Sequence, residues 1–523
     1  MTPLSALSSR DWDIIVIGGG ITGAGILREA ARLGLKALLV ERNDFASGTS
    51  SHSSKLIHGG LRYVAQGQIR LMRASVHARS HLLRDGSPLV KPLGYLHAIY
   101  KGDRINSFIF EMGIRAYAVL HGHLKVHQRL GPSEIGLYAP GLSEKDLSAA
   151  FVYEESGTDD ARLVLRVIRE ATDRGAVALN YTSAVGLLRD EHGQVNGILA
   201  KDSENGEPVS VRARVVVNAT GAWADNIRRH IEAPARLRPM RGSHLVIPGW
   251  RLRLGQIASF FHHENGRPVY CVPWQGVVLV GTTDVDQELL DENGEPRPSA
   301  EEIHFLLGGL QARFPTLNLT LKDVQAVFAG LRPVADMRTS DPTKASREHV
   351  ILHEAGLFTV AGGKLTTFHT MALDVLEKLR QHFPDLPKSR AETSALDPLP
   401  DLPSDFPLDS NLALDWTSRY GEAGLDFLAS SPPEERTPIH NHHSASLSDL
   451  RWSARHESVR HLDDLLLRRT RLGLVTPGGG VTLLPRIRPV AQEELNWTDN
   501  QWDEEVARYL AVWKRNYQTP KLA

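Results

Sequence analysis

The sequence predicts an α/β fold in which a parallel-stranded domain is interleaved with an antiparallel-sheet domain and followed by a helical C-terminal domain. Three observations support this prediction: a strand–glycine turn–helix–strand pattern near the start, later strands separated from it by long insertions, and helical spacing after a proline-rich stretch. The 523 residues, 41% of them hydrophobic and 23% charged, are ordinary for a globular protein and sufficient for several cores.

The opening unit is the best-defined part of the pattern. Ile14–Ile17 is a short apolar run typical of a buried parallel strand, Ala24–Leu33 has helical spacing, and Ala37–Val40 is a second strand that ends at Glu41. Further strands are expected at Val215–Asn218, Gly276–Val280 and Leu357–Val360. The alternation of Val269–Val272 and the run Val277–Val280 favour an antiparallel sheet in the second domain.

Asp385–Pro407 carries five prolines in a polar context and is predicted to be a linker. Beyond it, Ser458–Arg471 and Asp503–Lys514 have helical spacing. We therefore expect two interleaved domains within 1–395 and a helical domain over 396–523. The first domain is expected at about 10–90, 150–235 and 345–385, and the second at about 91–149 and 236–344.

Composition excludes several classes of protein. The 60 basic and 61 acidic residues give a formal net charge of -1, which argues against a nucleic-acid binder. Cys271 is the single cysteine, so an intramolecular disulfide and a cysteine-based zinc site are both excluded, and a buried strand position is expected for it. The first ten residues lack the features of a secretory signal, and the apolar stretch 14–27 is short and contains five glycines. We expect a cytoplasmic protein, or one bound to a membrane surface without crossing it.

Gly18, Gly20 and Gly23 form a G-x-G-x-x-G pattern between the first strand and the helix. In such a turn the first glycine allows the tight bend, the second lets the backbone approach a pyrophosphate, and the third lets the helix pack on the sheet. The helix N-terminus then offers free N–H groups to the anion. Glu41 follows 18 residues after Gly23, where a carboxylate accepts hydrogen bonds from a ribose. The pattern predicts a dinucleotide site.

Two later segments favour FAD over NAD. Val215–Gly221 runs from a strand into Ala-Thr-Gly, and Phe358–Lys364 runs from a strand into Gly-Gly-Lys. Both resemble flavin-contacting segments of the glutathione-reductase-like family, so a glutathione-reductase-like FAD-binding Rossmann domain is expected. A phosphate loop of the type G-x-x-x-x-G-K-[ST] is excluded at Gly362–Thr366. Phe358 stands where this motif needs its first glycine, and Leu365 stands where it needs a serine or threonine.

Thr49–Tyr63 resembles the signature of FAD-dependent (aerobic, respiratory) glycerol-3-phosphate dehydrogenases. The resemblance recurs at Asp159–Leu163, Gly242–His244, Gly281–Asp284, Gly330–Pro333, Gly363–Thr367 and Leu465–Gly473. It departs from the family pattern at Ala329 and at Phe368-His369, and residues of about 90–150 and 400–455 match poorly.

The resemblance implies a reaction: oxidation of sn-glycerol 3-phosphate to dihydroxyacetone phosphate, with hydride transfer to N5 of non-covalent FAD and electrons passed to a membrane quinone. The alternatives are an FAD-dependent oxidase that uses O₂ on a related polyol phosphate or an amine, and a flavoprotein that binds or regulates without turnover. The resemblance also argues against covalent FAD at His52.

The predicted cofactor-binding residues combine the glycine turn with the segments of the resemblance. They are Gly18, Gly20, Ile21, Thr22, Gly23, Glu41, Arg42, Thr49, Ser50, Ser53, Ser54, Gly59, Gly60, Val185, Ala219, Thr220, Gly221, Gly363, Lys364, Leu365 and Thr366.

Substrate chemistry needs donors for a phosphate and a base for the hydroxyl proton. Arg62, Arg332 and, by the resemblance, Arg347 are the phosphate candidates. Lys364 and Thr366 are expected where the third FAD segment meets the substrate, and Tyr63 is expected to close the pocket. The predicted catalytic residues are His58, His244, Arg332 and Lys364. Histidine titrates near neutrality, so His58 and His244 are both candidates for the base, and the sequence does not choose between them.

Two further patterns concern a metal site and a membrane surface. The histidines of His440–His443 resemble a set of metal ligands, but a solvated loop is the better interpretation, and we expect no metal.

Between Lys101 and Arg129 five basic and two acidic residues give a local charge of +3, and an apolar stripe runs at helical spacing. This stripe consists of Ile105, Phe108, Ile109, Met112, Ala116, Val119 and Leu120. It predicts either peripheral contact with the inner face of the cytoplasmic membrane, or packing on the core or in a homodimer interface.

Overall fold

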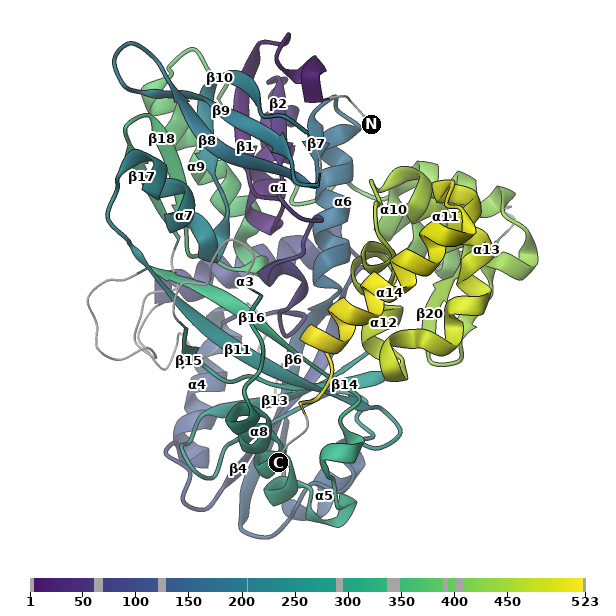
Figure 1. Ribbon diagram of the computed structural model, residues 1–523. Helices are drawn as coiled ribbons and strands as arrows, with labels where there is room; N and C mark the ends of the chain where they lie inside the picture. Colours follow the sequence, from purple (N-terminus) through teal and green to yellow (C-terminus); the bar gives the residue numbers. More distant parts are fainter. Residues whose placement is uncertain are drawn as a thin grey trace.

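The computed structural model describes residues 4–60, 69–120, 128–204, 206–287, 295–335, 349–388, 394–400, 402 and 408–520. Two sheets lie one above the other in the view of Figure 1, and the C-terminal helices flank the junction between them. The mixed α/β architecture expected from the sequence is confirmed.

The first sheet is mainly parallel, as the opening βαβ unit predicts. Its order is β17 (Val350–Glu354), β18 (Leu357–Ala361), β10 (Val209–Asn218), β1 (Trp12–Ile17), β2 (Ala37–Val40) and β7 (Val177–Leu179). All neighbours in this order are parallel except β17 and β18. The hairpin of β8 (Thr182–Arg189) and β9 (Val195–Asp202) extends the early half of β10 in an antiparallel direction.

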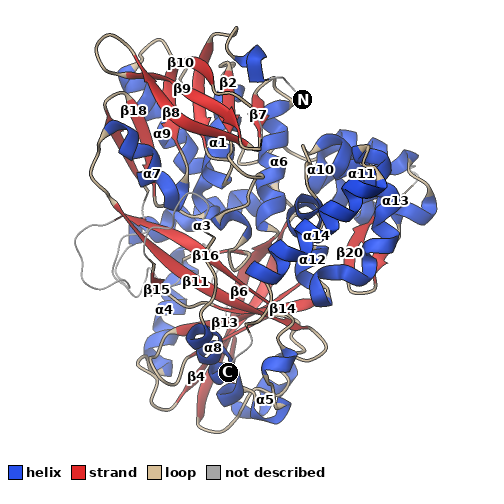
Figure 2. Ribbon diagram, viewed as in Figure 1, coloured by secondary structure: helices blue, strands red, loops and turns tan. Residues whose placement is uncertain are grey.

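Helices cover one face of this sheet, and the hairpin covers the other (Figure 2). The helices are α1 (Ile21–Arg32), α6 (Asp160–Thr172) and α9 (Phe368–His382). Side chains of β1 alternate between the two cores: Ile14 and Val16 pack under the helices, and Ile15 and Ile17 pack towards the hairpin. Because β1 is buried on both faces, it appears in the sequence as a continuous apolar run.

The second sheet is mainly antiparallel. Its order is β15 (Val285–Asp286), β11 (Leu237–Pro248), β14 (Val277–Gly281), β13 (Pro268–Trp274), β12 (Ile257–Phe261), β4 (Val90–Tyr100), β6 (Leu147–Thr158) and β3 (Leu56–Ile57). β16 (Ala326–Ala335) pairs with β11, and β5 (Gln128–Leu130) pairs with β6. β12 and β4 are parallel.

One face of the second sheet packs on α8 (Ala300–Arg313) and α5 (Pro132–Tyr138). The opposite face carries Val246, Leu279 and Phe328, and it shares a hydrophobic core with the C-terminal helices. Two helices follow β3 and β4 in the chain, α3 (Ile69–Asp85) and α4 (Ser107–Leu120).

The C-terminal unit is mainly helical, as expected. It contains α10 (Ser410–Ser430), the hairpin β19 (Pro438–His440) and β20 (His443–Ser446), α11 (Leu447–His456), a π-helical turn Asp464–Arg469, α12 (Leu472–Val475), α13 (Leu484–Leu495) and α14 (Asp499–Asn516). Ile487 and Tyr509 of this unit lie in the same buried cluster as Leu279 of the second sheet. The unit is therefore packed on the second sheet rather than tethered to it.

The proline-rich stretch differs from the solvated linker that its composition suggests. Ala395 and Leu396 are buried in the core of the first domain, and the Asp397 carboxylate accepts a hydrogen bond of 3.2 Å from Arg28. The Arg28 side chain is fully buried, so it needs carboxylate partners, and this segment supplies one of them.

Within the described residues, the structure contains no helix that is both long and apolar enough to cross a membrane.

Candidate active site

The glycine turn after β1 forms a cradle with no room for side chains. Gly18 has a φ of +113°, and a Cβ there would lie 2.7 Å from the carbonyl oxygen of Ala219. A Cβ on Gly23 would lie 1.9 Å from the carbonyl oxygen of Gly18. Gly20 caps α1, so the first N–H groups of the helix face the turn. The backbone is shaped to let a pyrophosphate approach closely.

Two features at the end of β2 also fit a dinucleotide. Oε2 of Glu41 accepts a hydrogen bond of 2.7 Å from the N–H of Gly19, which fixes the carboxylate beside the turn, and burial raises its pKa. The Arg42 guanidinium lies 5.2 Å from the ring centroid of Trp223. The indole Nε1 of Trp223 is buried and has no hydrogen-bond partner among the described residues. An orphaned buried donor at this position suits a cofactor acceptor.

Two of the remaining predicted FAD segments lie at the carboxyl ends of parallel strands. Ala219–Gly221 follow β10, and Gly363–Thr366 follow β18. The segment Thr49–Gly60, called the flavin segment below, joins this edge to the second sheet. Ser50 Oγ accepts a 3.0 Å hydrogen bond from the N–H of Ile21 in α1. Thr49 Oγ1 donates a hydrogen bond of 2.5 Å to the carbonyl of Leu331 in β16. Val185 lies in β8, away from these strand ends, and is 41% exposed.

The second sheet presents one face to the flavin segment. His244, Gly281 and Tyr270 are partners across β11, β14 and β13, and therefore lie on the same face. Arg332 is on this face too, because its partner Met240 lies four residues before His244 on β11. The ring of His58 lies 6.0 Å from that of Tyr270. The structure thus brings both histidine candidates to one face of the sheet.

His244 is held tightly at this face. Its Nε2 lies 2.8 Å from Ser54 Oγ, its ring stacks on Phe328 with centroids 4.7 Å apart, and its Nδ1 has no hydrogen-bond partner among the described residues. Burial lowers its pKa well below the ordinary value, and the cationic Arg332 and Lys55 add to the shift. His244 is therefore neutral at physiological pH.

Arg332 and Lys364 are anchored by their own partners. Arg332 donates hydrogen bonds to Asp284 Oδ1 at 2.7 Å and to Thr282 Oγ1 at 2.9 Å, and 28% of its side chain remains exposed. Lys364 Nζ donates to Ser75 Oγ at 3.3 Å. Three further substrate candidates, Arg62, Tyr63 and Arg347, lie outside the described residues.

The sequence reasoning missed three buried ionisable groups beneath the flavin segment, Glu155 and the pair Lys55 and Asp160. Glu155 Oε2 accepts a hydrogen bond of 3.0 Å from the N–H of Gly59, and Lys55 Nζ lies 2.9 Å from both carboxylate oxygens of Asp160. Lys55 and Asp160 both lie inside segments of the family resemblance, but they are 105 positions apart, and no spacing rule pairs them. Glu155 lies in a long strand next to another glutamate, and nothing local marks it as buried.

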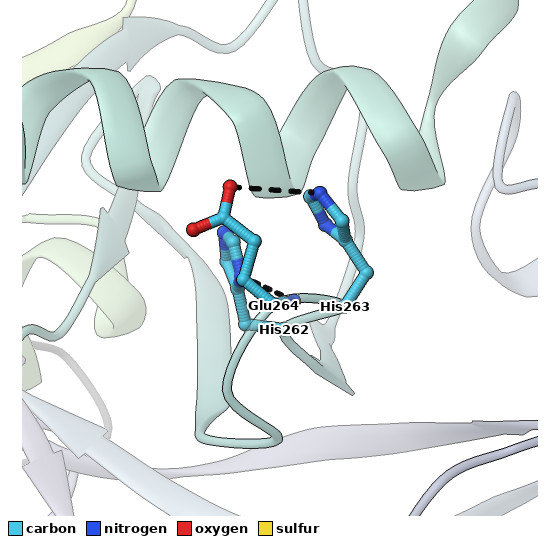
Figure 3. Close-up of side chains that lie close together, drawn as sticks. All are labelled: His262, His263 and Glu264. Carbon is cyan, nitrogen blue, oxygen red and sulfur yellow. Dashed lines mark hydrogen bonds and ion pairs between the residues drawn. The ribbon is translucent and has the colours of Figure 1, made fainter.

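Other clusters are explained by local structure. Figure 3 shows His262, His263 and Glu264 close together, but Nε2 of His262 lies 2.8 Å from the carbonyl of Phe305, and its Nδ1 accepts from the N–H of Glu264 at 3.3 Å. With both ring nitrogens engaged, this histidine fastens its loop to α8 rather than offering a metal ligand.

The His440–His443 turn is only partly the solvated loop that was predicted. His443 is buried, with Nε2 2.9 Å from Gln275 Oε1 and Nδ1 accepting from the N–H of Ala445. These two hydrogen bonds satisfy the buried ring. Cys271 is fully buried in β13, where burial raises the pKa of its thiol.

Residues 13–373 match the family model described as FAD dependent oxidoreductase, and residues 389–502 match that of the C-terminal domain of alpha-glycerophosphate oxidase. The chain is 35% identical to glycerol-3-phosphate dehydrogenase 2 of Mycobacterium bovis, over 97% of this chain and 88% of that protein. It is 35% identical to the aerobic glycerol-3-phosphate dehydrogenase of Staphylococcus epidermidis, over 71% of this chain and 68% of that protein. The structure of the glycerol-3-phosphate dehydrogenase from Bacillus halodurans complexed with FAD is similar with a TM-score of 0.76 and 27% identity, covering 98% of this chain and 96% of that one.

Proposed function

The chain belongs to the family of FAD-dependent glycerol-3-phosphate dehydrogenases, and on this premise we propose that it oxidises sn-glycerol 3-phosphate to dihydroxyacetone phosphate. The observation that supports this most directly is the shared face of the second sheet, on which His244 and Arg332 lie beside the flavin segment. A base and a phosphate donor are the two groups that oxidation of a phosphorylated secondary alcohol requires.

FAD, when bound, supplies the acceptor for the hydride from the carbinol carbon. The cradle of Gly18, Gly20 and Gly23 would hold its pyrophosphate, and Glu41 its ribose. The flavin segment and the loops after β10 and β18 would hold the rest of the cofactor. Non-covalent attachment is supported by His52, since its Nδ1 lies 2.8 Å from the carbonyl of Gly48 and its Nε2 lies 2.9 Å from the hydroxyl of Tyr517.

We assign the proton acceptor to His244. A general base must be unprotonated when it takes the proton, and the neutral ring of His244 lies on the face beside the flavin segment with an Nδ1 that has no hydrogen-bond partner among the described residues. Its Nε2 is oriented by the Ser54 hydroxyl, which belongs to the flavin segment. His58, beside Tyr270, would then line the substrate pocket without taking the proton.

The substrate phosphate would be bound by arginine and lysine side chains. Asp284 orients the Arg332 guanidinium, and a planar guanidinium can form a two-pronged contact with a phosphate. Lys364 and Thr366 lie directly after β18, at the edge where the FAD segments gather. The remaining phosphate candidates, Arg62 and Arg347, with Tyr63, complete the predicted set.

The proposed electron acceptor is a membrane quinone, and α4 supports it. Phe108, Ile109 and Met112 are 69%, 58% and 51% exposed, whereas Ile114 and Tyr117 on the same helix are buried. Phe108, Ile109 and Met112 of the predicted apolar stripe therefore face outward, away from the side of α4 that packs on the protein. An exposed apolar helix face next to basic Lys101 and Arg104 suits the interface of an anionic bilayer, and we propose peripheral binding at the inner face of the cytoplasmic membrane.

Anaerobic titration of the purified holoenzyme tests the substrate. Glycerol 3-phosphate should bleach the flavin absorbance, and glycine, proline and sarcosine should not. Bleaching by an amine alone would overturn the substrate assignment. The acceptor is tested separately: a quinone should reoxidise the bleached enzyme rapidly, and stoichiometric peroxide in air would indicate the oxidase alternative.

A further inference from the structure

The C-terminal unit reaches the FAD-binding domain through Arg471, which belongs to the conspicuous Leu465–Gly473 motif. Its side chain is 2% exposed. Arg471 Nε donates a hydrogen bond of 3.0 Å to Asp159 Oδ1, and Nη2 donates to Asp160 Oδ1. Asp159 and Asp160 lie at the start of α6, so one guanidinium joins the two domains by way of two neighbouring carboxylates.

Asp160 also holds the flavin segment. Its Oδ2 accepts hydrogen bonds from the N–H and the hydroxyl of Ser53, at 3.1 and 2.7 Å. Lys55 Nζ lies 2.9 Å from each of its oxygens and donates to the carbonyl of Ser51 at 2.8 Å. The backbone of Lys55 has a φ of +60°, a conformation that a lysine adopts only where its surroundings hold it. One buried carboxylate thus connects Arg471 to two residues of the flavin segment.

The charges in this network balance. Lys55 and Arg471 oppose Asp159 and Asp160, and Lys55 and Asp160 are fully buried. Burial lowers the pKa of Lys55 to about 8 despite the adjacent Asp160. Although burial opposes it, the Arg471 guanidinium lowers the pKa of Asp159. Removal of any one member leaves an uncompensated charge, so the network tolerates few arrangements.

A second contact between the C-terminal unit and the flavin segment comes from Tyr517, which follows directly after α14. Helix α14 runs towards the junction of the two sheets in Figure 1. Its hydroxyl lies 2.9 Å from His52 Nε2, and its carbonyl accepts a 2.8 Å hydrogen bond from the N–H of Val327 in β16. Tyr517 is therefore fixed to the second sheet while its hydroxyl holds the flavin segment at His52.

We propose that Arg471 and Tyr517 are positioning residues of the FAD site: through Asp160 and His52, the C-terminal unit fixes the conformation of residues 49–55. This conformation in turn sets the affinity and the reduction potential of bound FAD. The inference rests on FAD binding and not on the identity of the substrate. It gives the C-terminal unit a role in the chemistry of the active site.

The test uses the full chain with Tyr517→Phe and Arg471→Lys, and Arg451→Ala as the matched control. Arg451 forms a comparable ion-pair network with Glu435 and Glu494, but entirely within the C-terminal unit. Three quantities are measured without substrate: the Kd for FAD after reconstitution, the midpoint potential of the bound flavin, and hydrogen exchange of the peptide spanning 49–55 in the FAD-free protein.

Tyr517→Phe should weaken FAD binding about three- to tenfold, as expected for one hydrogen bond, speed exchange in 49–55 and shift the potential. Arg471→Lys should have larger effects on the Kd, the potential and the exchange rate, because a lysine ammonium cannot donate to both carboxylates as the planar guanidinium does. Arg451→Ala should lower only the Tm.

If Tyr517→Phe and Arg471→Lys keep the wild-type Kd, potential and exchange rates, the two contacts serve stability alone and the proposal is overturned. Should Arg471→Lys fail to fold, Tyr517→Phe decides by itself. An enzyme that does not oxidise glycerol 3-phosphate would leave these measurements unchanged, so the two proposals fail separately.

Discussion

The backbone N–H of Gly59 donates a hydrogen bond of 3.0 Å to Oε2 of Glu155, a residue that is only 2% exposed. This contact fixes the end of the flavin segment to β6. Burial raises the pKa of the Glu155 carboxyl from its ordinary 4.5 to about 7, although Arg79 and the N–H of Gly59 favour the charged form. A group that titrates near neutrality therefore lies directly beneath the active site.

Stability should depend on pH through Glu155. The folded state binds this proton more tightly than the unfolded state does, so the unfolding free energy falls as pH rises from about 4.5 through about 7, by up to about 3 kcal/mol. Glu155→Gln should match the wild type near pH 5 and become more stable than it above pH 7. Thermal unfolding of the holoenzyme across this range measures the effect.

Glu191→Gln is the control for Glu155, because the side chain of Glu191 is 86% exposed and Glu191 is not among the charges that shift the pKa of Glu155. The change of its Tm difference across this pH range should be much smaller than that of Glu155→Gln. A Glu155→Gln variant whose Tm difference is the same at both ends of the range would show that the carboxyl is already ionised at low pH.

Arg332→Ala should reduce kcat/KM for glycerol 3-phosphate by about ten- to a hundredfold. A charge-assisted hydrogen bond contributes roughly 1.5–3 kcal/mol, and about 1.4 kcal/mol corresponds to a factor of ten. Arg332→Lys should recover only part of the lost kcat/KM, since the ammonium group of a lysine keeps the charge but cannot form the two-pronged contact of a planar guanidinium. FAD content should remain at the wild-type level.

Arg251→Ala serves as the control for Arg332, because Arg251 is similarly exposed, at 26%, and similarly paired, to Asp323 at 2.5 Å, on the same domain. It should leave kcat/KM unchanged. Wild-type turnover by an FAD-replete Arg332→Ala variant would mean that the phosphate binds elsewhere.

His244→Asn should lower kcat by roughly 10²- to 10⁴-fold, the usual contribution of a general base, and His58→Asn should lower it much less. Because the pKa of His244 lies well below 6.5, the wild-type pH–rate profile should show no acid limb from this residue between pH 6 and 8. The reverse ranking of the two variants would move the base to His58.

Replacing Phe108, Ile109 and Met112 together by glutamine should weaken binding to phosphatidylglycerol vesicles by at least about tenfold. Each apolar side chain that leaves water contributes about 1.5–3 kcal/mol when fully buried, and partial insertion gives a fraction of that. Co-sedimentation with the vesicles is the measurement, and Leu137→Gln, at an 85% exposed apolar position on α5, is the control.

If the triple variant sediments like the wild type but converts a dimer into monomers, the α4 face is a subunit interface. Static light scattering on the same samples distinguishes this outcome from membrane binding.

The sequence by itself determined the local geometry of the glycine turn after β1. Close backbone approach requires glycine at Gly18, Gly20 and Gly23, and Glu41 follows directly after β2. A pattern within some 30 residues was therefore sufficient to predict this turn. The same holds for β2, whose bounds match the expected Ala37–Val40. The apolar periodicity of α4 was also readable, because helical periodicity is a local property, but the exposure of Phe108, Ile109 and Met112 was decided by the structure. The residue boundaries assigned to the three domains remain predictions.

The tertiary structure alone decided which distant groups meet. His244 and Arg332 share a face only because β11 and β16 pair in one register, and a shift of one residue would have turned Arg332 away. The burial of Glu155 and the junction of Lys55, Asp160 and Arg471 depend on contacts across as many as 311 positions. Burial and charge pairing are set by the summed packing of the whole chain, and no short window of sequence contains that information.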